Sequence, residues 1–133
     1  MAADDDPDRL PTGGLYEWFR RGLELLDSGN AAAAAQLLTR AVEHDPQSRS
    51  LREALGRAQF DAHDFAAARD SFARIVEADP TDDYAQFGYG LAATRLGELD
   101  QAVVHLALAV AMRPELVHYA RALRQARAQL ATR

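Results

Sequence analysis

The chain has 133 residues and no cysteine, so it can bury one modest core and cannot form disulfides or thiolate metal sites. Its net charge of −5 at pH 7 argues against general nucleic-acid binding, which needs a net basic surface. The longest apolar run covers only residues 106–112, which is too short for a membrane span, so we expect a cytoplasmic protein without membrane association.

The charges are distributed unevenly along the chain. The first 14 residues hold four aspartates and one arginine (net −3), whereas the last 19 hold four arginines and one glutamate (net +3). Residues 1–12 have no apolar stretch and do not resemble a signal peptide, so we expect residues 1–14 to form an acidic, disordered tail. All 15 basic residues are arginine, which bacterial GC-rich codon usage explains most simply; bidentate contacts would explain a few of them.

Seven segments place apolar residues three and four positions apart, which is the spacing of amphipathic helices. They cover residues 16–27, 31–44, 51–62, 65–78, 84–96, 99–112 and 115–130. The first break contains Gly29, which can adopt a positive φ, and Asn30, which can cap the next helix. Asp64 is placed to cap the fourth helix and Gly97 to end the fifth.

Four classes of residue recur every 34 positions along these helices. They are proline at 46, 80 and 114, glycine at 22, 56 and 90, alanine at 34, 68 and 102, and a large apolar residue at 38, 72 and 106. A period of this length is typical of helical solenoids, in which each hairpin buries its apolar face by stacking on its neighbours. A glycine inside a helix costs about 1 kcal/mol relative to alanine, so the recurring glycines and alanines indicate close helix crossings within each hairpin.

These positions resemble the tetratricopeptide repeat, whose pattern is Trp-x2-Leu-Gly-x2-Tyr, then Ala-x3-Phe, then Pro. The resemblance covers residues 15–116. It implies an all-α fold: a right-handed α-solenoid of three helix-turn-helix repeats (15–48, 49–82 and 83–116) with a capping helix at 117–131. Polar residues stand at four positions where the family places large apolar groups, which predicts a looser fit of the first helix in repeats two and three: Arg21, Arg52, Gln59 and Gln86.

The last helix has no partner after it, so we expect it to be apolar on one face and polar on the other. The expected outer face carries Arg121, Arg124 and Arg127. The expected inner face carries Val117, Ala120, Leu123, Ala126 and Leu130.

The resemblance also implies a concave groove lined by the first helix of each repeat. Its positions in this chain carry more aromatic residues than a surface requires, with arginines among them, which favours an apolar or amphipathic segment of another protein as the ligand. The alternative is that several of these side chains pack between repeats as core. The predicted groove residues are Tyr16, Phe19, Arg20, Leu23, Glu53, Arg57, Phe60, Tyr84, Phe87, Leu91 and Arg95.

One recognition mode known in this family can be tested by residue type. Some members hold the C-terminal carboxylate of a chaperone peptide with lysine and asparagine side chains. The matching positions here are Phe19, Leu23, Ala54, Tyr84 and Gly88, among which only the Tyr84 hydroxyl can donate a hydrogen bond. We therefore do not expect that mode in this chain.

No residue pattern indicates an enzyme, a metal site or a cofactor. The four histidines, at 44, 63, 105 and 118, lack the spacing that places a metal-binding pair on one helix face. The chain has no Gly-rich phosphate loop and no serine elbow. We therefore predict a non-catalytic adaptor or scaffold that binds another protein or peptide.

Two further hypotheses remain open at this point. The alternative function is a self-assembly module that forms weak homo-oligomers through its solenoid ends, near Leu15 and Trp18. Separately, the acidic tail would compete with a partner if it folded back onto Arg20, Arg57 or Arg95.

Overall fold

The computed structural model describes residues 14–133, which form seven α-helices and contain no strand. The expected acidic tail, and its hypothesised contact with the groove arginines, lie outside the described residues. The predicted all-α fold is confirmed. The helices are α1 (Leu15–Asp27), α2 (Ala31–His44), α3 (Arg49–Asp61), α4 (Phe65–Ala78), α5 (Asp83–Leu96), α6 (Leu99–Met112) and α7 (Val117–Ala131).

The helix boundaries follow local capping chemistry. Helix α3 begins two residues earlier than predicted because the Ser48 hydroxyl accepts a hydrogen bond from the backbone N–H of Leu51 at 3.2 Å. Asp82 caps α5 in the same way, and Asp64 caps α4 as predicted. Asn30 is the N-cap residue of α2, as predicted, but its side chain donates to the Ser28 hydroxyl at 3.0 Å and makes no cap bond to the helix.

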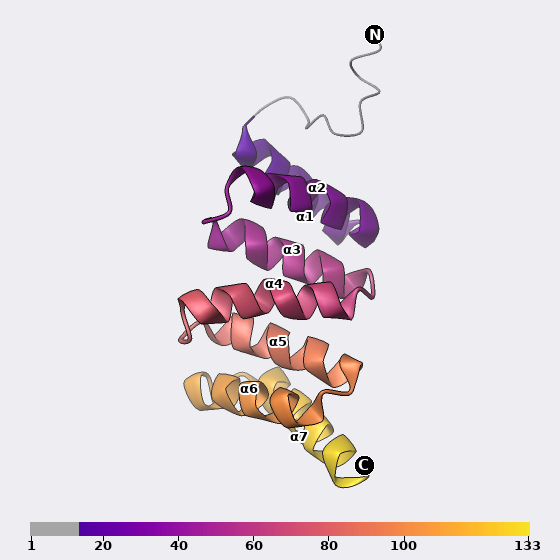
Figure 1. The fold of residues 1–133 in the computed structure, drawn as a ribbon, viewed down its shortest axis with the longest axis vertical. Coiled ribbons are helices and arrows are strands. Elements are labelled where there is room, and N and C mark those ends of the chain that lie inside the picture. The colour runs from indigo at the N-terminus through magenta and orange to yellow at the C-terminus, as the bar shows by residue number, and fades with distance from the viewer. Residues whose placement is uncertain (1–13) are drawn as a thin grey trace.

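The helices stack in chain order from α1 at one end to α7 at the other (Figure 1). Each helix packs against the next, and α1, α3, α5 and α7 also contact one another in series. Among residues 14–133, the even-numbered helices make no such contacts with one another. The odd-numbered helices therefore form the tighter, inner layer, and the stack curves towards them.

The turns of the stack lie on two opposite edges (Figure 1). The turns within the hairpins α1–α2, α3–α4 and α5–α6 lie along one edge. The turns that join one hairpin to the next lie along the other edge, where the Asp-Pro sequences occur.

The recurring glycines make room for the recurring large apolar residues. A Cβ at Gly22 would lie 2.7 Å from Leu38, and one at Gly56 would lie 2.9 Å from the ring of Phe72. Gly90 meets Leu106 in the same way. The recurring alanines, at 34, 68 and 102, are all completely buried, so both residue classes mark close crossings as expected.

Two of the polar residues that predicted a looser fit are in fact satisfied by partners inside the stack. Gln86 is only 2 % exposed, and its Nε2 donates to the Pro80 carbonyl at 3.0 Å. Gln59 accepts a hydrogen bond from the Ser71 hydroxyl at 2.6 Å. Among residues 14–133, no buried side-chain nitrogen or oxygen lacks a partner, so these substitutions do not loosen α3 or α5 through unpaired polar groups.

Helix α7 covers the end of the stack, but on a face that differs from the prediction. Its three arginines at 121, 124 and 127 are exposed as expected. Val117, however, is 62 % exposed, so its assignment to the inner face is wrong. The buried side is rotated and consists of Tyr119, Ala122, Leu123 and Ala126.

Candidate peptide-binding groove

The predicted groove residues lie on the odd-numbered helices, and five of them surround one cavity between α3 and α5. This α3–α5 pocket has a volume of about 280 Å³, enough for one large apolar side chain. Its lining is mostly aromatic and aliphatic. The lining residues are the predicted Arg57, Phe60, Tyr84, Phe87 and Leu91, together with Asp61, Phe72 and Gly88.

Phe72 of α4 connects this pocket to the core of the stack. Its ring is 2 % exposed and lies against Gly56 of α3 and Gly88 of α5, where a Cβ on Gly88 would approach it to 2.6 Å. The Tyr84 ring lies 6.1 Å from it at a steep angle. Because glycine occupies position 88, the Phe72 ring reaches between the two inner helices and lines the cavity.

Arg57 is the cationic member of the pocket. Within residues 14–133 it makes no hydrogen bond and no ion pair, although its charge acts on both Glu53 and Tyr84. Burial raises the pKa of the Tyr84 hydroxyl, and Arg57 partly offsets that rise. Arg57 is therefore free to pair with an acidic group of a ligand.

Glu53 lies next to this region on α3 without lining the pocket. Burial raises the pKa of its carboxyl, and the charges of Asp82 and Asp83 raise it further, against the effect of Arg57 and Arg49. Its position places a partly buried carboxyl near the unpaired arginine. Glu53 therefore moderates the positive charge of the groove.

Helix α7 supports the pocket from behind through Tyr119, a residue that the repeat pattern does not single out. The rings of Phe87 and Tyr119 stack with their centroids 4.5 Å apart. The Tyr119 hydroxyl donates to Asp83 at 2.6 Å, and burial together with this bond raises its pKa. In the sequence, Tyr119 is recognisable only as an aromatic residue in the predicted capping helix. The repeat positions do not indicate that its ring contacts Phe87.

Arg95 lies over aromatic rings at the far end of α5. Its guanidinium carbon is 4.8 Å from the centroid of the Phe65 ring and 5.6 Å from that of Phe60. The Phe60 and Phe65 rings are themselves 5.1 Å apart in an edge arrangement. Arg95 therefore fixes the Phe60 wall of the pocket and does not line the cavity.

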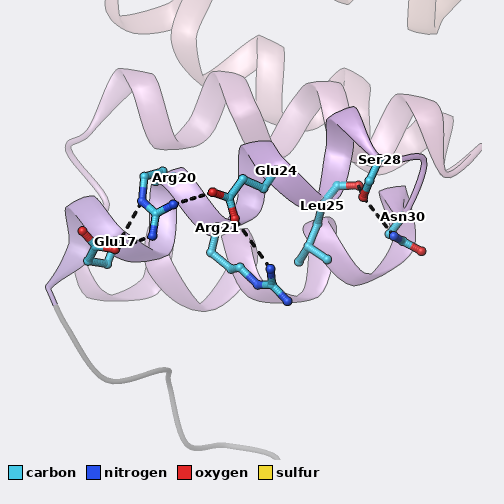
Figure 2. A network of polar contacts seen from close by, with 7 residues as sticks. All are labelled: Glu17, Arg20, Arg21, Glu24, Leu25, Ser28 and Asn30. Atoms are coloured by element: carbon cyan, nitrogen blue, oxygen red, sulfur yellow. Dashed lines mark hydrogen bonds and ion pairs between the residues drawn. The ribbon is translucent and has the colours of Figure 1, made fainter.

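The four predicted residues on α1 are not part of the pocket. Phe19 and Leu23 are half-buried and pack against the core of the first two hairpins, as the alternative interpretation expected. Tyr16 is 74 % exposed. Figure 2 shows that Arg20 points along the surface of α1 into ion pairs with Glu17, at 2.7 Å, and with Glu24.

The described part of the chain offers no site for a metal and no span for a membrane. Residues 14–133 contain no group of three or more histidine, aspartate or glutamate side chains placed to hold an ion. None of the helices in that range combines the length and hydrophobicity needed to cross a bilayer.

Comparison with known proteins identifies the type of repeat. A family model described as "Tetratricopeptide repeat" matches residues 19–83 and, in an overlapping second match, residues 54–117. Together the two matches cover most of the chain. No curated protein sequence matches it.

Several solved structures share the fold. MamA of AMB-1 is 21% identical with a TM-score of 0.77; the match covers 89% of this chain but only 64% of MamA, so the chain spans under two thirds of that relative. The first TPR domain of human RPAP3 is 20% identical, with a TM-score of 0.81 and coverage of 89% and 93%. The first TPR of Spaghetti (RPAP3), bound to the HSP90 peptide SRMEEVD, is 20% identical, with a TM-score of 0.83 and coverage of 92% and 97%.

Proposed function

The chain belongs to the tetratricopeptide repeat family, and on that premise we propose that it is a non-catalytic adaptor that binds an apolar or amphipathic segment of another protein along α3 and α5. Members of this family are protein-interaction modules. We assign the binding to residues 15–133, in the repeats 15–48, 49–82 and 83–116 with the capping helix, and we place the protein in the cytoplasm of a bacterium.

The observation that carries this proposal is the α3–α5 pocket with its unpaired arginine. A cavity of about 280 Å³ with aromatic walls suits one large apolar side chain as an anchor. Arg57 at the same cavity suits an acidic residue next to that anchor. The ligand that fits both features is an extended or helical segment with a bulky apolar residue beside an aspartate or glutamate.

The peptide held by the RPAP3 domain is not the model for this ligand. Of the five positions that would carry a carboxylate clamp, Ala54 and Gly88 are buried, and Phe19 and Leu23 are apolar. Tyr84 alone has a donor, and it lines the α3–α5 pocket. We therefore propose recognition through an internal apolar anchor rather than through a C-terminal carboxylate.

A selection from a random peptide library tests this function directly. Peptides retained by the full chain should share a large apolar residue beside an acidic one, and they should bind at least tenfold more weakly to Arg57→Ala and to Phe87→Ala. Arg124→Ala, an exposed arginine on α7, is the matched control and should bind like the wild type. Equal binding by all three variants, each still folded by circular dichroism at the temperature of the assay, would remove the groove from consideration.

A second candidate function is self-assembly through the ends of the stack. It is favoured by exposed apolar groups on the terminal helices, Tyr16 on α1 and Val117 on α7. Light scattering over a concentration series separates the two functions, because only self-assembly predicts a mass that grows with concentration. If it grows, Val117→Asp should abolish the growth and leave peptide binding intact.

A further inference from the structure

A second concavity lies beside the turn that joins the first hairpin to the second. It lies between the α2–α3 turn, the start of α3 and the end of α4, with a volume of about 440 Å³. It shares no residue with the α3–α5 pocket. We call it the inter-repeat cleft; the residues that matter are Pro46, Arg49, Arg52, Arg74, Ile75 and Asp79.

The inter-repeat cleft is cationic in a protein that is otherwise acidic. Three guanidinium groups and one carboxylate line it, a net charge of +2, whereas the whole chain carries −5. This local excess of positive charge is a property of the fold, because it brings together arginines from two different helices. The three arginines do not have equal access to the carboxylate.

Asp79 is already fully engaged with other groups. It accepts hydrogen bonds from the backbone N–H of Thr81 at 3.0 Å and from the Thr81 hydroxyl at 2.6 Å, and Arg49 donates to it at 3.0 Å. The Thr81 bonds first, and then Arg49, hold the pKa of this carboxyl below its usual value. Arg49 also lies 3.3 Å from Asp82. Asp79, the one acidic residue that lines the cleft, is therefore paired with Arg49 and not with Arg52 or Arg74.

Arg52 and Arg74 are left without an acidic partner. Arg52 donates one hydrogen bond to the Pro46 carbonyl at 3.0 Å, and neither arginine makes an ion pair with any residue from 14 to 133. Burial, and then the nearby charge of Arg74, lower the pKa of Arg52. Both side chains line the cleft and their positive charges repel one another, so an anion bound in the cleft would neutralise these charges.

We propose that the inter-repeat cleft binds an acidic side chain of a partner protein, with its carboxylate held between Arg52 and Arg74. Guanidinium groups bind a carboxylate through paired hydrogen bonds in a fixed geometry. Pro46 and the buried Ile75 supply apolar surface for the methylene groups of a glutamate. A long polyanion such as a nucleic acid fits poorly, since the chain as a whole carries a net negative charge.

This surface is separate from the groove, so its test is independent of the groove. The full chain is titrated with a capped tetraglutamate peptide while the Nε–Hε signals of the arginines are followed by NMR. The signals of Arg52 and Arg74 should move with the peptide, while those of Arg121, Arg124 and Arg127 on α7 should move less. Arg57→Ala, which removes the unpaired arginine of the α3–α5 pocket, should leave the movement of the Arg52 and Arg74 signals unchanged.

Arg74→Gln provides the decisive variant, because its side chain makes no hydrogen bond or ion pair within residues 14–133 and its loss should leave the fold intact. Arg74→Gln should weaken the binding of the peptide by about tenfold or more, whereas the matched Arg124→Gln should not change it. Equal binding by Arg74→Gln, or equal movement of the α7 signals, would overturn the proposal.

Two further titrations identify other occupants. A response to inorganic phosphate without any response to the peptide would mean a small-ion site and would overturn the assignment to a protein side chain. A movement of the Arg52 and Arg74 signals in a variant with Asp4, Asp5, Asp6 and Asp8 changed to asparagine, before peptide is added, would assign the cleft to the chain's own acidic segment instead.

Discussion

The side-chain oxygen of Gln86 lies 2.6 Å from Nδ1 of His105, and this contact joins α5 to α6 inside the third hairpin. Because Nε2 of Gln86 donates to the Pro80 carbonyl, its oxygen is the acceptor and His105 carries its proton on Nδ1. The His105 ring also lies 4.0 Å from that of Tyr89. A polar residue at an apolar family position is thus part of a satisfied network.

Gln86→Leu should therefore destabilise the protein, although it restores the residue type typical of the family. It leaves the Nδ1 proton of His105 partly buried without an acceptor, a cost of about 1–3 kcal/mol. Urea unfolding of the two proteins measures the difference. His105→Leu in the Gln86→Leu background removes the second partner and should recover part of the loss; a single variant as stable as the wild type would contradict the assignment.

The same histidine predicts how stability depends on pH. Burial lowers the pKa of His105, so the folded state favours its neutral form. Its contribution to stability is full above the ordinary histidine pKa of about 6.5 and is lost as the pH falls from there through the lower folded value. The unfolding free energy of the wild type should thus drop more between pH 7.5 and pH 5 than that of His105→Gln. Parallel curves would exclude this role.

The 34-residue period was sufficient to predict the series of helices and their hairpin stacking, because glycine, alanine and proline at fixed spacing each have a packing reason. It did not predict cap geometry at every turn. Asn30 and Asp64 occupy equivalent positions, but Asn30 bonds to Ser28 whereas Asp64 bonds to the N–H of Ala67 at 3.4 Å. Ser28 offers Asn30 a hydroxyl acceptor, whereas Ala62, the equivalent residue before Asp64, offers none, and a comparison of the cap positions alone ignores this.

The candidate site was predictable only in part, because repeat positions do not describe the side chains that surround each residue. Repeat positions placed Arg57, Phe60, Tyr84, Phe87 and Leu91 on one surface, and all five line the α3–α5 pocket. They did not distinguish the α1 residues, of which Phe19 and Leu23 pack against the core, Arg20 is held in local ion pairs and Tyr16 is exposed. Nor did they reveal the inter-repeat cleft, because its arginines come from different helix positions that only the fold brings together.

Gly88→Ala should destabilise the protein and deform the α3–α5 pocket. The added Cβ would lie 2.6 Å from the Phe72 ring, which Gly56 confines on its other side. Overpacking of this kind costs about 1–3 kcal/mol, against a gain of about 1 kcal/mol in helix propensity. Thermal unfolding measures the balance. Gly14→Ala, where a Cβ meets nothing within 4 Å, is the control, and Phe72→Leu should rescue Gly88→Ala.

His63→Gly should stabilise the protein. His63 has a φ of 65° and stands 34 residues after Gly29 and 34 before Gly97, which have φ values of 86° and 77°. A non-glycine residue in this left-handed region costs about 1–2 kcal/mol, part of which is offset by glycine's greater freedom in the unfolded chain. The melting temperature should rise for His63→Gly and fall for Gly29→Ala; no change in either would show that the turn tolerates side chains.

Glu53→Gln should raise stability at pH 7 and leave it unchanged near pH 3. Burial raises the pKa of Glu53 above its unfolded value of about 4.3, so its contribution is fully present below that value and is lost as the pH rises through the folded one. Glutamine keeps the shape and carries no charge, so at neutral pH it removes the desolvation cost. Unfolding curves for both proteins at pH 3, 5 and 7 measure how the difference grows.

The opposite outcome would also be informative about the groove. If the wild type were the more stable protein at pH 7, the attraction of Glu53 to Arg57 and Arg49 would outweigh burial and repulsion by Asp82 and Asp83. Arg57 would then be engaged within the chain, and an acidic ligand would have to displace Glu53 from it. Under the predicted outcome the attraction of Glu53 to Arg57 does not outweigh the cost of burying Glu53. Glu53→Gln should then strengthen the binding of an acidic peptide, because it removes a carboxylate that repels the peptide and attracts Arg57.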